Sequence, residues 1–281
     1  MESTTLRRGS LSRYAQAALV ALLLTLAVAS WALTDERMAG MDGGPGTELG
    51  GLGWFIGVWL VMMAAMMFPS LAPMVVAHAG TQRASLGRTA AGVRTTAFVA
   101  GYLLAWTAAG LAGYLLIEAI RSLDLSVLDW DSGGPYVVGG VILAAAAYQL
   151  TPLKDSCLRR CREPREFLAA HWHPGLGGAL RTGFDHGAFC IGCCWALMAV
   201  LFALGVMSLT WMVLIAALIA AEKLLPSPPA VKRGVAALLV VLALAVAFAP
   251  DSIPGLTIPG SMDMGSSGSM APMDSMGMPG R

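Results

Sequence analysis

Charged side chains are scarce in this chain of 281 residues. Asp, Glu, Lys and Arg together make up only 12% of it, whereas soluble globular domains carry about 25%. Hydrophobic residues make up 57%, and the mean hydropathy is +0.69. This composition argues against an ordinary soluble domain and predicts an all-α, polytopic integral membrane protein.

The sequence also lacks the motifs of several familiar chemistries. It has no Gly-x4-Gly-Lys-Ser/Thr loop, no Gly-x-Gly-x-x-Gly turn, no His-Glu-x-x-His pair and no basic and aromatic pattern for nucleic acid. No set of nucleophile, base and orienting acid can be nominated, so we predict neither catalysis nor a nucleic-acid partner. The central turns of the predicted membrane helices carry no charge or histidine, which argues against a proton-coupled transporter.

Long apolar runs indicate about seven membrane-spanning helices, because about 20 apolar residues cross about 30 Å of hydrocarbon. The run 188–221 is too long for one crossing, so we divide it into a hairpin that turns near Gly205 to Thr210. The other predicted spans are 14–33, 54–77, 95–117, 135–151 and 234–249. Together these runs define a helical membrane domain over residues 14–250.

The positive charges orient this bundle, because Lys and Arg near helix ends stay on the cytoplasmic side. Of the 18 Lys and Arg residues, only Arg37, Arg121 and Arg281 fall outside on the seven-helix arrangement. We therefore predict a bacterial-type inner (plasma) membrane protein with residues 1–13 in the cytoplasm and an external C-terminus.

The first helix has a rival interpretation as a cleaved signal peptide. Arg7, Arg8 and Arg13 precede an apolar stretch in which Ala27-Val28-Ala29 resembles a cleavage site. In either case residues 34–52 face outward.

Cysteine is absent except in one short segment that holds all five: Cys157, Cys161, Cys190, Cys193 and Cys194. The first two fall in a predicted cytoplasmic loop, 152–186, and the other three in the first turns of the fifth helix. In a reducing compartment, clustered cysteines are more often metal ligands or redox centres than disulfides. The competing interpretation is that Cys193 and Cys194 are small buried packing residues.

The cysteine spacing suits one centre on a helix. Cys190 is three and four residues before Cys193 and Cys194, so one helical face can present all three thiols. The predicted loop and helix start also contain His171, His173 and His186, which would allow a mixed Cys/His site. We expect Asp185 to orient His186 as an outer partner.

Methionines form a second candidate site in the second predicted helix. Met62 and Met66 are four residues apart, as are Met63 and Met67, which stacks thioethers near mid-membrane. Thioethers and thiolates are soft ligands that select copper(I). Methionine is also an adaptable filler of apolar cores, so packing is the competing interpretation.

Residues 251–281 form a third candidate, an external tail predicted to be disordered. Methionine recurs there among Gly, Ser, Pro and Asp, at Met262, Met264, Met270, Met273, Met276 and Met278. Such a segment has nothing to pack against, so copper capture competes with neutral low complexity as its explanation.

Three stretches together resemble the family of predicted metal-binding integral membrane proteins of unknown function, some of which are similar to copper-resistance determinants. They are the Met-Met-Ala-Ala-Met-Met-Phe-Pro-Ser-Leu-Ala-Pro stretch ending at Pro73, the stretch Tyr148–Pro164, and Gly187-Ala-Phe-Cys-Ile-Gly-Cys-Cys-Trp-Ala-Leu-Met198. The resemblance covers about residues 50–228 and implies metal binding within a membrane bundle. Glu222-Lys-Leu-Leu-Pro226 looks like the end of that domain, where we interpret Glu222 and Lys223 as an interfacial anchor.

The combined prediction is a membrane protein that binds or delivers a soft metal, copper first and zinc or iron as alternatives. Its expected partners are the lipid bilayer and metal-carrier proteins on either side of it. The main alternative is a thiol-redox or electron-transfer protein with an iron-sulfur or haem centre. A structural zinc site that fixes the cytoplasmic segment is a further alternative.

Overall fold

A computed structural model describes residues 11–38, 50–123, 133–205, 208–226, 228–250 and 253. These residues form nine α-helices, and the described part contains no strand, so the all-α prediction is confirmed. The tail methionines after Pro250 lie outside the described residues. The helices are α1 (Arg13–Met38), α2 (Leu52–Ser85), α3 (Arg88–Arg121), α4 (Gly134–Gln149), α5 (Pro152–Arg162), α6 (Pro164–Ala170), α7 (Gly175–Leu204), α8 (Leu209–Leu224) and α9 (Pro228–Phe248).

Five of these helices, α1, α2, α3, α7 and α9, are long and apolar enough to cross a membrane. The pair α4 and α5 would make a sixth span, bent by 67° at the break between them. Helix α8 has only 16 residues. Every predicted span thus overlaps a helix of the described residues, while the number of about seven crossings and the orientation stay predictions.

The predicted break in the long run 188–221 is present. Helix α7 ends at Leu204, the next residue Gly205 has φ +114°, and α8 begins at Leu209. A φ in this range is easily reached only by glycine, so Gly205 ends α7 and allows the chain to change direction.

The segment 152–186 is helical rather than a loop. It contains α5, α6 and the first turns of α7. Helix α5 begins with Pro152 at its first turn, and the side chain of Thr151 accepts a hydrogen bond from the Lys154 backbone N–H at 3.3 Å. The hydropathy pattern misses these helices because they are short and polar.

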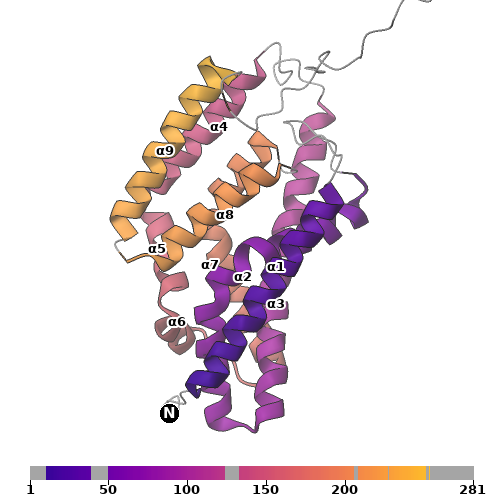
Figure 1. Cartoon of the computed structure of the whole chain (residues 1–281), viewed down its shortest axis with the longest axis vertical. Coiled ribbons are helices and arrows are strands. Elements are labelled where there is room, and N and C mark those ends of the chain that lie inside the picture. The colour runs from indigo at the N-terminus through magenta and orange to yellow at the C-terminus, as the bar shows by residue number, and fades with distance from the viewer. Residues whose placement is uncertain are drawn as a thin grey trace, which may run out of the picture.

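Helices α3 and α7 pack against each other along much of their length, α1 lies on α2, and α4 lies on α9 (Figure 1). The α3–α7 contact is close enough for backbone to touch backbone. A Cβ added at Gly101 or Gly183 would lie 1.9 Å from the carbonyl oxygen of Leu180 or Phe98, respectively. Glycine at both positions therefore permits the approach that brings α3 to the cysteine-bearing part of α7.

Candidate metal centre

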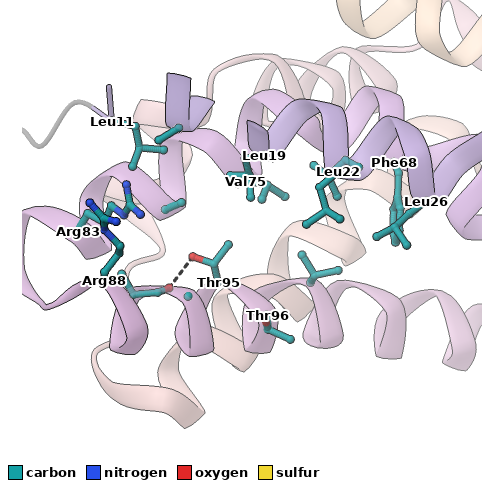
Figure 2. Close-up of a pocket in the computed structure, with 16 residues that line it drawn as sticks. Leu11, Leu19, Leu22, Leu26, Phe68, Val75, Arg83, Arg88, Thr95 and Thr96 are labelled. Carbon is teal, nitrogen blue, oxygen red and sulfur yellow. Dashed lines mark hydrogen bonds between the residues drawn. The ribbon is translucent and has the colours of Figure 1, made fainter. Parts of the chain in front are cut away.

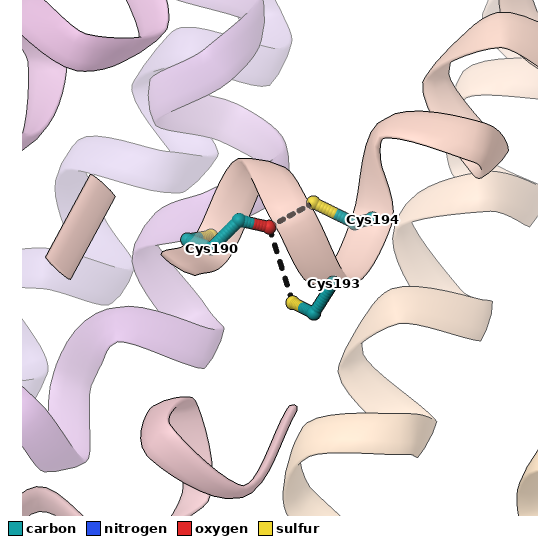
Figure 3. A group of neighbouring side chains, drawn as sticks. All are labelled: Cys190, Cys193 and Cys194. Carbon is teal, nitrogen blue, oxygen red and sulfur yellow. Dashed lines mark hydrogen bonds between the residues drawn. The ribbon is translucent and has the colours of Figure 1, made fainter. Parts of the chain in front are cut away.

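Three cysteines of α7 gather their sulfurs inside the protein. The Sγ atoms of Cys190, Cys193 and Cys194 all lie within 4.8 Å of one another, and each residue is at most 2% exposed. The Cys193 and Cys194 thiols donate to the Cys190 carbonyl oxygen at 3.1 and 2.8 Å, one helical turn back (Figure 3). The helical spacing seen in the sequence thus gives the expected group of thiols.

A fourth sulfur comes from α5. The Sγ atoms of Cys161 and Cys193 are 3.8 Å apart, although 32 residues separate them. Two thiolates on one tetrahedral ion at about 2.3 Å would lie about 3.8 Å apart, so this spacing suits a shared metal. Cys157 packs against Gly192 instead, where an added Cβ would be 2.7 Å from its sulfur. The two cysteine groups therefore converge, with Cys157 at the edge.

A buried lysine of α8 faces this group. Lys223 Nζ lies 3.0 Å from Cys190 Sγ and 3.4 Å from Ser70 Oγ. The Tyr102 hydroxyl of α3 lies 3.1 Å from the same sulfur. An ammonium and a hydroxyl at hydrogen-bond distance both stabilise a thiolate, so Cys190 sits where negative charge on sulfur is favoured.

The prediction that Glu222 and Lys223 form an interfacial anchor is wrong. Glu222 is 2% exposed and Lys223 is 9% exposed. Glu222 accepts a hydrogen bond from Lys154 of α5 at 2.6 Å, and Gln149 also accepts from that ammonium. This buried ion pair ties α5, which carries Cys161, to α8, which carries Lys223.

Residues 56–246 match the sequence model of the PpoB2 copper chaperone family. The chain belongs to this family. No curated protein and no solved structure matches the chain. In this copper chaperone family member the matched range contains the α2 methionines, all five cysteines and Lys223, and it leaves the tail 251–281 outside. The match agrees with the resemblance to metal-binding proteins and specifies copper.

The candidate histidines of this copper chaperone family member lie in different surroundings. His171 stacks on Phe167 with ring centroids 4.7 Å apart, and His173 Nε2 lies 3.4 Å from the Asp185 carboxylate. Neither joins the group of three cysteine sulfurs. The expectation that Asp185 orients His186 is wrong, because the start of α7 places that carboxylate on His173.

His186 is the histidine nearest to the cysteines along α7. It lies one helical turn before Cys190 and is only 3% exposed. Its ring is packed between aromatic residues, with Tyr102 at 5.9 Å and Phe167 at 5.0 Å between centroids. Its Nδ1 atom is buried and has no hydrogen-bond partner among the described residues.

The α2 methionines line the interior. Met62, Met63, Met66 and Met67 are each at most 2% exposed. Ser70 follows Met66 by one turn and meets Lys223, which in turn meets Cys190. The methionine-bearing part of α2 therefore leads toward the cysteine group.

Sequence reasoning missed Lys223 and Tyr102 as parts of this site. The signal for Lys223 was available, because an ionisable pair directly after an apolar run is costly to bury and marks a functional site by default. Tyr102 gave no such signal, since its contact with Cys190 depends on the close packing of α3 on α7.

Proposed function

We propose that this protein is a membrane-embedded copper(I) carrier that holds its cargo ion on cysteine sulfurs of α5 and α7. The observation that carries the proposal is the convergence of Cys161, Cys190, Cys193 and Cys194 in the buried interior beside Lys223. Soft thiolates favour copper(I) over harder ions, and the family match supports copper as the metal.

The charge of the site also favours copper(I) over zinc. A copper(I) ion on two thiolates of this group, with the other two cysteines protonated, carries one net negative charge, which the single ammonium of Lys223 offsets. A zinc(II) ion with four thiolates would carry two. Because uncompensated charge is costly in a buried site, the singly charged complex is the better match to this pocket.

The methionines supply an approach to the cysteines. We assign Met62, Met63, Met66 and Met67 to an intermediate thioether site, since they are buried on the part of α2 that leads to Ser70 and Lys223. In the proposed orientation the N-terminus is cytoplasmic, the tail 251–281 is external and gathers copper, and carrier proteins exchange the ion on either side.

The test is the copper content of purified full-length protein loaded anaerobically. We expect the variant with Cys190, Cys193 and Cys194 all changed to Ser to bind fewer copper equivalents than the unmodified chain, because three of the four converging sulfurs are gone. Cys157→Ser is the matched control, since Cys157 lies at the edge of the group, and it should bind copper as the unmodified chain does.

Equal copper stoichiometry in the triple variant would overturn the assignment. The absorption spectrum separates the alternatives, because copper(I) thiolate is colourless whereas iron-sulfur and haem centres absorb visible light. Iron with visible bands would indicate electron transfer. Tightly held zinc, with no copper taken up, would indicate a structural zinc site.

A further inference from the structure

Helix α2 carries metal-binding side chains beyond the methionines. Along α2, residues four apart form a buried row of thioethers interrupted by one hydroxyl and ending at an imidazole: Met62, Met66, Ser70, Met74 and His78. Each member is one turn from the next, so an ion can be passed between neighbours without crossing a layer of hydrocarbon side chains.

Helix α7 carries a second row of the same kind. Its members, again four residues apart and buried, are Met198, Cys194, Cys190 and His186. Read in this order they change from thioether to thiolate to imidazole. Both rows therefore place methionine at one end and histidine at the other.

One direct contact and two links through other helices relate the two rows. Trp59 of α2 stacks on Phe202 of α7 with centroids 5.6 Å apart. Ser70 is joined to Cys190 through Lys223. His78 and His186 both stack on Phe98, at 4.6 and 6.1 Å. These links follow opposite orders along the two helices, so α2 and α7 run antiparallel, and His78 and His186 both lie against the Phe98 ring.

At the histidine end of the two rows, one ring nitrogen of each histidine has no hydrogen-bond partner among the described residues. His78 and His186 are 0% and 3% exposed, and the Nδ1 atom of each is buried without a hydrogen-bond partner among the described residues. An unsatisfied buried polar atom is costly to a fold, and a bound ion would satisfy it. Imidazole is a common ligand for copper.

We propose that His78 and His186 form a second copper(I) station, one turn from Met74 on α2 and one turn from Cys190 on α7. This inference rests on the proposed copper-carrier function and names the next step of the ion. In that step a bond from copper to the His186 imidazole forms as the bond to the Cys190 sulfur breaks. Copper stays in the +1 state, no electron is transferred, and the released thiolate remains beside the Lys223 ammonium.

The test is X-ray absorption of the full-length protein as copper(I) is added anaerobically up to saturation. We expect sulfur ligation alone at the first equivalent and imidazole scattering to appear as further equivalents bind. The double variant His78→Leu and His186→Leu should lose the imidazole signal and keep the sulfur signal. The matched control changes His171 and His173 to Leu, which removes the same number of imidazoles from outside the row and should keep both signals.

A methionine rescue separates ligation from packing. Methionine and leucine have similar volumes, but only methionine offers a ligand to copper(I). His186→Met should therefore restore the bound equivalents that His186→Leu loses. Imidazole scattering that never appears, or that persists in the double Leu variant, would overturn the station while leaving the cysteine carrier intact. An unmodified protein that takes up no copper at all would overturn both the histidine station and the cysteine carrier.

A separate observation points to a lipid site. A groove of about 390 Å³ lies between α1, α2 and α3, and aliphatic side chains such as Leu19, Leu22 and Val75 line most of it (Figure 2). Arg83 and Arg88, which flank the turn between α2 and α3, lie together at one end. Both side chains are exposed, and neither forms an ion pair with a described residue.

We infer that this groove binds an anionic phospholipid, with an acyl chain along the leucines and the phosphate on the two guanidinium groups. Paired arginines bind phosphate oxygens with charge-assisted hydrogen bonds, and basic pockets between membrane helices hold anionic headgroups. The charge pattern is complementary, since the one charged end of a mostly apolar groove carries two positive charges.

Thermal unfolding of the full chain in detergent tests this site with added phosphatidylglycerol or phosphatidylcholine of the same chain length. Phosphatidylglycerol should raise the midpoint more than phosphatidylcholine does, and inorganic phosphate alone should not. The variant R83Q/R88Q should lose this preference, while the control R159Q/R181Q, with two arginines outside the groove, should keep it. A preference that is absent in the unmodified chain, that survives in R83Q/R88Q, or that phosphate alone reproduces would overturn the lipid site.

Discussion

Glu222 and Lys223 are neighbours in sequence, yet they serve different parts of the site. Successive side chains on a helix point about 100° apart, so one faces Lys154 and the other faces Cys190. Each charge is buried and each has a partner, as buried charges require. A two-residue pair at the end of α8 thus fixes the position of α5 and supplies the countercharge of the cysteines.

The buried pair of Lys154 and Glu222 gives a prediction for stability. Glu222→Leu should lower the free energy of unfolding by about 3–5 kcal/mol, because it leaves the Lys154 ammonium buried without its carboxylate. The double variant Lys154→Met and Glu222→Leu should recover most of that loss. Equilibrium unfolding of both variants measures the coupling, and a Glu222→Leu protein as stable as the original would contradict the pair's role.

At this scale the sequence predicts contacts that follow from one helix and misses those between helices. The grouping of Cys190, Cys193 and Cys194 could be predicted because three- and four-residue spacing determines it locally. The contact of Lys223 with Cys190 could not, since it depends on how α8 packs on α7. For the same reason Asp185 was assigned to its chain neighbour His186 rather than to His173.

Among the helices, the α3–α7 contact sets the geometry of the centre. Gly101 and Gly183 let the two backbones meet, and Tyr102 next to Gly101 then reaches Cys190. The ring of Phe98 in α3 also stacks on the ring of His186 in α7, with centroids 6.1 Å apart. The contact between Tyr102 and Cys190 thus depends on two glycines, Gly101 and Gly183.

Replacing either glycine should disturb this contact. In Gly183→Ala the new Cβ would lie 1.9 Å from the Phe98 carbonyl oxygen, so the helices must separate. Overpacking of this kind costs about 1–3 kcal/mol, and here backbone rather than a flexible side chain must move. The midpoint of thermal unfolding and the amount of copper retained should both fall. Gly92→Ala in α3 is the control, because nothing lies within 4 Å of the added Cβ, and equal effects of the two changes would contradict the close contact.

The sequence predicts which elements exist better than where they end. The expected span 54–77 lies within α2, which runs from Leu52 to Ser85 and so continues beyond the span mainly at its C-terminal end. Hydropathy marks the part of a helix that suits hydrocarbon, and the helix continues into polar residues where backbone hydrogen bonds still favour it. Helices α5 and α6 were missed for the same reason, since they lack a long apolar run.

For the whole molecule, the family match covers the helical core and leaves the methionine-rich tail outside it. Residues 56–246 match the copper chaperone family, and residues 251–281 do not. The core contains every cysteine and the four candidate methionines of α2, whereas the tail holds six further methionines. The cysteine centre should therefore be complete without the tail.

Removing residues 251–281 should change how much copper the protein gathers and not how tightly the cysteines hold it. The tail thioethers are soft, weak ligands beyond the core, so the total bound equivalents should fall. Competition with a colorimetric copper(I) chelator should give the same dissociation constant for the tightest site. A full-length variant with the six tail methionines changed to Ser should match the truncation. The tail has no copper role if the number of bound equivalents stays the same in both.

The placement of Lys223 also determines when the centre is complete during synthesis. Translation makes Cys190 first and its countercharge 33 residues later, at the end of α8. Until that helix has emerged and docked, the nascent chain has the three thiols of α7 without the ammonium that balances a copper-thiolate complex. In the proposed copper-binding function, metal loading is thereby coupled to the completion of α8, and a product that stops short of α8 should be a poor trap for copper.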